Sequence, residues 1–165
     1  MAAVDPIDSA ILGHLQRDAR LTNRELARLV GVAPSTCLER VRSLRARGVI
    51  TGYHAAVEPR ALGRTLQALV FARLRPLSRE VITSFESYLY ELPEVVSVMV
   101  VSGDEDFVVH VAVPDIEHLH GFLMDRFSAR REVVSFRSSM IYRRTATRTL
   151  TPMTGPDERS RRADP

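Results

Sequence analysis

The sequence predicts an α+β protein with two domains, and the period of its apolar residues carries that prediction. Three stretches with helical spacing fill the first 47 positions, and an alternating pattern follows Gly48. Farther on, strand-like and helix-like stretches follow in the order β-α-β-β-α-β. We expect a three-helix, winged helix-turn-helix domain with a hinge strand (1–60), a ferredoxin-like domain (61–145) and a flexible tail (146–165).

The first two helices have clear start signals. Asp5 is a suitable cap for a helix over residues 6–17, and the proline at position 6 fits the first helical position. Thr22, with Glu25 three residues later, forms the capping-box pattern of a second helix. Gly31 ends that second helix and provides the turn before the third.

The third helix is expected to begin near residues 33–34 and to continue to Arg47, with Gly48 closing it. The alternating stretch VITGYHAAV (49–57) then predicts the hinge strand, and Glu58-Pro59 marks the domain boundary. Three short helices with a glycine-containing turn between the second and the third have the outline of a helix-turn-helix.

The second domain is expected to be a four-stranded sheet with two helices on one face. A sheet face without helices has to be covered, and a second copy of the chain is the simplest cover. The predicted strands span 66–76, 95–103, 107–114 and 133–142, and the predicted helices span 78–93 and 115–128.

Charge divides the chain. Residues 1–60 hold nine arginines and six acidic residues, whereas residues 61–142 hold eight arginines and eleven acidic residues. A polyanion would therefore bind the first part. No apolar run is long enough to cross a membrane and no export signal is visible, so a cytoplasmic protein is expected. Cys37, the single cysteine, is expected to be a buried apolar residue, and no metal or cofactor motif is present.

The third helix carries the candidate nucleic-acid interface. Its apolar residues gather on one side, and small polar residues with one glutamate lie opposite, between two basic margins. Such a helix fits the major groove of double-stranded DNA, where the centre contacts base edges and the margins hold phosphates. The centre comprises Ser35, Thr36, Glu39 and Ser43, and the margins are Arg40 with Arg47 and Arg42 with Arg45.

A simpler interpretation is that these arginines form only the solvated face of a packed helix, which is the commoner situation. The three-helix context with its glycine turn favours DNA binding instead. Thr22 and Asn23, at the start of the preceding helix, would add a hydroxyl, an amide and backbone N–H groups for a phosphate.

The stretch from Ile7 to Gly63, including the closing Gly-Val-Ile-x-Gly-Tyr at 48–53, resembles the N-terminal half of the Lrp/AsnC transcription factors. The segment VVSGDEDFVVHVAVPD (100–115) resembles the signature of their ligand-sensing domain. The resemblance covers residues 4–145. It implies a DNA-binding regulator that responds to an amino acid or a related metabolite, and that forms homodimers and in some cases octamers.

The resemblance places the effector site at the loop Ser102 to Asp106. Gly103 lets backbone approach a ligand, and a carboxylate such as Asp104 or Asp106 suits an ammonium group. Taken without the resemblance, GDED is equally well a polar hairpin turn. The chain departs from the family pattern at Glu132, where a glycine is usual, and at Ser138, a further candidate effector residue where a threonine is usual.

An enzyme is the alternative, because sirohaem decarboxylases resemble the same two-domain architecture. The available histidines are His110, His118 and His120, and the last two do not share a helical face. A lone histidine on a strand is more often packed than catalytic. No nucleophile set, paired carboxylates or phosphate loop is visible, so we predict no catalytic residues and no enzymatic activity.

Overall fold

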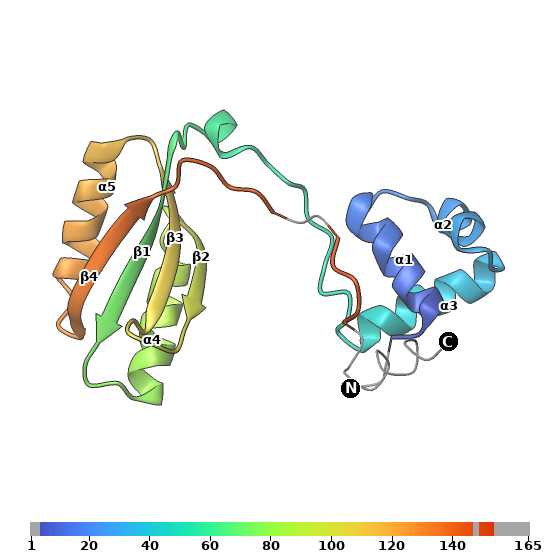
Figure 1. Ribbon diagram of the computed structural model, residues 1–165, viewed down its shortest axis with the longest axis horizontal. Coiled ribbons are helices and arrows are strands. Elements are labelled where there is room, and N and C mark those ends of the chain that lie inside the picture. The colour runs from blue at the N-terminus through green and yellow to red at the C-terminus, as the bar shows by residue number, and fades with distance from the viewer. Residues whose placement is uncertain (1–3, 147–148, 154–165) are drawn as a thin grey trace, which may run out of the picture. The chain divides into compact units, whose positions relative to one another are not determined.

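The computed structural model describes residues 4–146 and 149–153, which form two compact units (Figure 1). One unit comprises the described residues up to Ala55 and those after Arg144, and the other comprises residues 56–144. The division therefore lies five residues before the predicted boundary at residue 60. The segment after Ala55 joins the second unit because Arg64 donates from its guanidinium to the carbonyl oxygen of Ala112, at 3.2 Å.

Three helices build the first unit, as the sequence predicted: α1 (Pro6–Arg17), α2 (Asn23–Val30) and α3 (Pro34–Ala46). The Asp5 carboxylate caps α1 by accepting from the Asp8 N–H at 2.8 Å. The Thr22–Glu25 capping box is present at the start of α2. Their shared core consists of Ile11, Leu26, Ala27, Cys37 and Leu44, all at most 2 % exposed.

Glycine ends two of these helices. Gly31 after α2 has φ +72° and Gly48 after α3 has φ +70°, in the left-handed region that favours glycine. Burial raises the pKa of the Cys37 thiol, in keeping with its expected role as a small packed residue.

The predicted hinge strand is not a β-strand in this structure. Residues 51–58 are exposed and make no ladder, and the described part of the first unit holds no strand. A strand requires a neighbour that pairs with its N–H and C=O groups, and nothing in the described part of the chain pairs with this segment. The alternating sequence pattern alone does not supply that neighbour.

The second unit has the predicted β-α-β-β-α-β order. Its antiparallel sheet has the strand order β2-β3-β1-β4, which is the ferredoxin-like arrangement. A short 3₁₀ turn, η1 (Pro59–Leu62), precedes the first strand, and a π turn, η2 (Met124–Ser128), extends the last helix. The elements are β1 (Leu66–Leu74), α4 (Arg79–Tyr90), β2 (Val95–Val100), β3 (Phe107–Val113), α5 (Ile116–Leu123) and β4 (Val133–Met140).

Helices α4 and α5 cover one face of this sheet (Figure 1). On β1 the alternate residues Ala68, Val70, Ala72 and Leu74 are fully buried against them. Three phenylalanines join the layers, because the ring of Phe85 meets those of Phe107 and Phe127 edge-on at 5.1 and 6.0 Å between centroids.

The opposite face of the sheet carries no helix. Phe71 on β1 pairs across strands with Val108 on β3 and Arg137 on β4, so all three side chains lie on this open face. The Arg137 guanidinium lies 3.8 Å from the centre of the Phe71 ring.

Most of the predicted flexible tail, 146–165, lies outside the described residues. Within the described part, Leu150 returns to α1: its N–H donates to Gln16 Oε1 at 2.7 Å, and its carbonyl accepts from Gln16 Nε2 at 2.9 Å. Among the described residues, no helix is long and apolar enough to cross a membrane.

Candidate nucleic-acid interface and effector site

Helix α3 presents the polar face that the sequence indicated. Cys37 and Leu44 are buried against α1 and α2, and the opposite face is open. This face is made of Ser35, Thr36, Glu39 and Ser43, all exposed. The structure thus brings the four candidate base-contacting side chains together on one surface.

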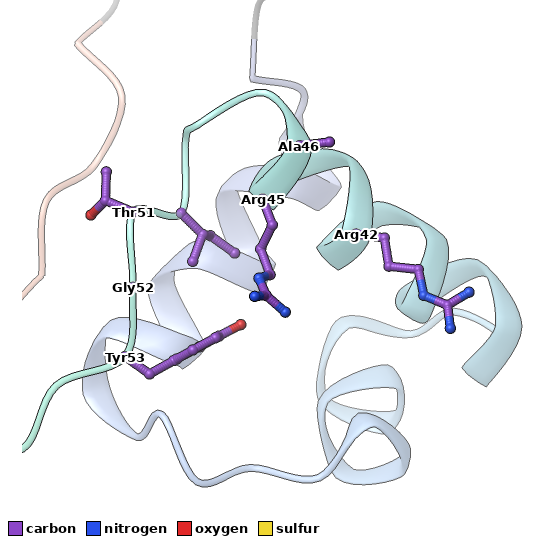
Figure 2. A pocket seen from close by; sticks show the side chains of 7 residues that line it. Arg42, Arg45, Ala46, Thr51, Gly52 and Tyr53 are labelled. Atoms are coloured by element: carbon purple, nitrogen blue, oxygen red, sulfur yellow. The ribbon is translucent and has the colours of Figure 1, made fainter.

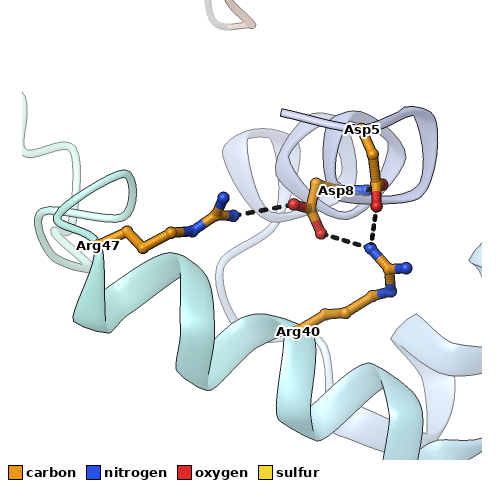
Figure 3. A network of polar contacts seen from close by, with 4 residues as sticks. All are labelled: Asp5, Asp8, Arg40 and Arg47. Atoms are coloured by element: carbon orange, nitrogen blue, oxygen red, sulfur yellow. Dashed lines mark hydrogen bonds and ion pairs between the residues drawn. The ribbon is translucent and has the colours of Figure 1, made fainter. Parts of the chain in front are cut away.

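The margin of Arg40 and Arg47 is engaged inside the unit (Figure 3). Both guanidinium groups donate to the Asp8 carboxylate, each at 2.9 Å, and Arg40 also pairs with Asp5. Asp8 is nearly buried, with 8 % of its side chain exposed. The N–H of Asp8 and the guanidinium of Arg40 lower the pKa of Asp5, and Asp5 in turn raises the pKa of Arg40.

These ion pairs change the interpretation of the third helix. Arg40 and Arg47 were expected to hold phosphates, but each already has a carboxylate partner on or beside α1. Their side chains therefore join α3 to α1 and its N-cap residue. The pairing partners lie more than 30 residues earlier in the sequence, which is why helical spacing did not reveal them.

The second margin, Arg42 and Arg45, borders an open groove where α3 ends (Figure 2). The groove has a volume of about 490 Å³. Arg45 points toward the ring and hydroxyl of Tyr53, and Arg42 projects from α3 one turn earlier. Its lining consists of Arg42, Arg45, Ala46, Ile50, Thr51, Gly52 and Tyr53.

Sequence reasoning did not place Thr51 and Tyr53 at this groove, because they follow the helix and were assigned to a hinge. Folding the chain back after Gly48 brings them beside Arg45. A tyrosine placed close behind two spaced arginines was the available signal. Two guanidinium groups with hydroxyls, arranged around an open groove, suit a sugar-phosphate backbone.

Thr22 and Asn23, the other predicted phosphate contacts, have partners within the unit. The Thr22 hydroxyl donates to Glu25 at 2.7 Å, and the Asn23 amide donates to the carbonyl of Pro34 at 2.8 Å. Asn23 therefore joins the first turn of α2 to the first turn of α3. Only Asn23 links the two helices, because the Thr22 bond lies within the capping box of α2 itself.

The candidate effector loop connects β2 to β3. Gly103 has φ +132°, a conformation that other residues rarely adopt. The Arg73 side chain donates from Nε to the Asp104 carbonyl at 2.7 Å, which fixes the loop backbone against β1. Among the described residues nothing donates to the Asp104 carboxylate, and Ser102, Gly103 and Asp104 are exposed.

Asp106 and Ser138 differ from the other effector candidates. Asp106 accepts from the Leu74 N–H at 2.8 Å and from Arg75 at 3.3 Å, so its carboxylate is bonded to the C-terminal end of β1. Ser138 lies on β4 and pairs with Val70 on β1. Strand β1 therefore separates Ser138 from the loop. No hydrogen bond joins Ser138 to Ser102–Asp106 in the described part of the chain.

Glu132, the departure from the family pattern, forms an ion pair at the same end of the sheet. Its carboxylate accepts from Arg130 at 2.6 Å, and its carbonyl accepts from the Arg75 N–H at 2.8 Å. Arg75 also forms an ion pair with Asp106, so Arg75 links Glu132 to the candidate loop. A glutamate here adds charge where the family pattern has none.

Two of the three candidate histidines have partners among neighbouring side chains. His110, 6 % exposed, bonds through Nε2 to Gln67 Oε1 at 2.9 Å, and burial, with Arg144 nearby, lowers its pKa. This is the packed strand histidine that the sequence indicated. His118 meets Glu94 at 3.2 Å.

Comparisons with known protein families match both units. Residues 4–51 match winged helix-turn-helix DNA-binding domains, and residues 67–151 match the Lrp/AsnC ligand binding domain. The chain belongs to the Lrp/AsnC family of transcriptional regulators. It is a DNA-binding regulator with a ligand-binding domain, and not an enzyme.

Named Lrp/AsnC relatives agree along most of the chain. The HTH-type transcriptional regulator AldR of Mycolicibacterium smegmatis is 40% identical over 139 residues, which cover 84% of this chain and 81% of AldR. The leucine-responsive regulatory protein of Escherichia coli K12 is 39% identical over 113 residues, covering 68% and 69%. The L-methionine complex of the regulator NMB0573 from Neisseria meningitidis superimposes with a TM-score of 0.82 at 27% identity, covering 92% and 97%.

Proposed function

We propose that α3 enters the major groove of double-stranded DNA with Ser35, Thr36 and Glu39 directed at base edges. The observation that carries the proposal is the open polar face of α3 beside the arginine-lined groove. Arg42 and Arg45 neutralise phosphates there, with Thr51 and Tyr53 as hydroxyl donors to the same strand. The side chains of Arg40, Arg47 and Asn23 support the position of α3 from within the unit, and Thr22 caps the start of α2.

The test of this function is footprinting on the DNA upstream of the protein's own gene. A dimer with two-fold symmetry should protect roughly palindromic half-sites about one helical turn, or a multiple of it, apart. The experiment is repeated with each of the twenty L-amino acids. Uniform weak protection at every sequence would contradict a sequence-specific regulator.

The proposed effector is an amino acid or a related metabolite at the loop Ser102–Asp106, and its action takes place in the cytoplasm, where the DNA is. Support comes from the free carboxylate of Asp104, which suits an ammonium group, and from the L-methionine complex of the related NMB0573. We propose no resident cofactor.

Replacing Asp104 with asparagine is expected to weaken effector binding about ten-fold or more, because a charge-assisted hydrogen bond to an ammonium group is lost. Isothermal titration with the amino acids that alter the footprint measures this loss of effector affinity. The fold should be unaffected, because among described residues the Asp104 carboxylate has no partner. Asp125→Asn is an exposed matched change, and this variant should bind the effector as tightly as the parent protein does. Equal effector affinities in the two variants would show that the effector site is not at Asp104.

We further propose a homodimer through the open face of the sheet, with an octamer as the larger assembly. The open face includes Phe71 and Val108 on the two central strands, and a sheet with helices on one side only needs a second layer. A closed two-fold pairing is the commonest way to provide one.

Substituting Val108 with aspartate is expected to weaken dimerisation ten-fold or more, because the interface would then bury an unpaired charge. Sedimentation velocity over a series of protein concentrations measures the monomer fraction. Thr83→Asp, on the exposed side of α4, is the matched control. A Val108→Asp protein that stays as dimeric as this control would exclude the open face as the interface.

A further inference from the structure

Glu94, in the turn between α4 and β2, carries a buried polar atom that the fold does not satisfy. Its Oε2 has no hydrogen-bond partner among the described residues, whereas Oε1 meets His118 at 3.2 Å. The side chain is 17 % exposed. A buried carboxylate oxygen without a donor is rare in folded proteins, because losing water without a replacement costs free energy.

Glu94 is also one of the residues that line a cavity of about 240 Å³. It is smaller than the 300–1,000 Å³ typical of sites for drug-sized ligands, so it suits a small metabolite. Leu62, Pro93 and Pro114 supply apolar wall, and Glu94, His118 and Arg64 supply the charged groups.

Arg64 provides the opposite charge on the same cavity. Its guanidinium donates to the Ala112 carbonyl at 3.2 Å, and the Ala112 N–H donates to the Glu94 carbonyl at 2.9 Å. Ala112 on β3 therefore binds both Arg64 and Glu94 and keeps them close together. A guanidinium group has five N–H donors, and this bond to Ala112 uses one of them.

We propose that this cavity is a binding site for an amino acid with a small apolar side chain. Glu94 accepts the ammonium group, Arg64 donates to the carboxylate, and the apolar walls hold the side chain. Rotation about the last bond of Glu94, which has a broad energy profile, turns either oxygen toward the ammonium. The pairing of one carboxylate with one guanidinium favours a zwitterion over a simple anion.

The site is separate from the effector loop. The loop precedes β3 and the cavity lies at its end, so the six residue steps from Phe107 to Val113 place them about 20 Å apart at roughly 3.3 Å per residue. Leu62 and Arg64 belong to the segment that leads from the boundary at Ala55 into β1.

The test is isothermal titration of the full-length protein with each of the twenty L-amino acids, followed by the N-acetyl derivative of any that binds. Glu94→Gln is expected to weaken binding ten-fold or more, and N-acetylation, which removes the ammonium charge, to abolish it. Leu62→Trp fills the cavity from its exposed rim while keeping every polar group, and should have the same effect. Glu117→Gln, on the exposed side of α5, should change nothing.

Asp104→Asn separates this site from the proposed effector loop. Binding that Glu94→Gln and Leu62→Trp weaken but Asp104→Asn leaves intact supports the cavity. Binding that only Asp104→Asn weakens overturns the cavity and leaves the loop proposal standing. Binding of no amino acid overturns both. Leu62→Trp retains Glu94, so this variant shows whether the amino acid binds in the cavity even if the Glu94→Gln protein does not fold.

Discussion

Replacing Asp8 with asparagine is expected to destabilise the first unit by about 1–3 kcal/mol. The nearly buried Asp8 carboxylate accepts from Arg40 and from Arg47, each at 2.9 Å, so the change removes one charge facing two guanidinium groups. Breaking a fully buried pair costs more, about 3–5 kcal/mol, but both arginine side chains are more than a quarter exposed and regain water.

Urea unfolding followed by circular dichroism measures this loss, and amide hydrogen exchange shows whether it is confined to α1 and α3. The exchange measurement matters because two units need not unfold together. Asp125→Asn, an exposed change of the same kind in the second unit, is the control. If both variants unfold at the same urea concentration, the ion pairs do not hold α3 in place.

Replacing Arg42 or Arg45 with alanine is expected to weaken binding to every DNA duplex, by roughly three- to ten-fold near 100 mM salt. Each change removes one phosphate contact, so the slope of log affinity against log salt should fall by about 0.9. Fluorescence anisotropy with a specific and a scrambled duplex over a salt series gives both quantities. Arg79→Ala, on α4 in the other unit, makes the same charge change away from the groove.

Arg40→Ala gives the sharper comparison. Because Arg40 pairs with Asp5 and Asp8, its removal should lower stability while leaving the salt slope close to that of the parent. A drop in slope as large as that of Arg45→Ala would show that Arg40 contacts phosphate after all. Changes at Ser35, Thr36 or Glu39 should instead alter the preference between duplexes, and unchanged preference would mean that another face of α3 meets the bases.

Local patterns predicted the elements well, because the forces that start and end them act within a few residues. Asp5 caps α1, the Thr22–Glu25 box starts α2, and both closing glycines have positive φ. The hinge segment has no pairing strand in the described part of the chain, because a ladder needs a partner strand, which an alternating sequence does not provide.

The candidate sites were predicted only in part. The polar centre of α3 and the exposed Asp104 lie where the sequence placed them. Asp106, by contrast, is bonded to the C-terminal end of β1, and Ser138 lies across β1 from the loop. Closeness in sequence to a functional motif does not show whether a carboxylate is free to bind a ligand.

By itself, then, the sequence determined the helices, the strands, their order and the Lrp/AsnC resemblance, because periodicity, caps and turn glycines are local properties. Only the tertiary structure decided which arginines are free. Arg40 and Arg47 are joined to Asp5 and Asp8 across more than 30 residues, whereas Arg42 and Arg45 remain beside the groove. It also brought Arg64, Glu94 and His118 to one cavity, since packing joins groups that no sequence spacing relates.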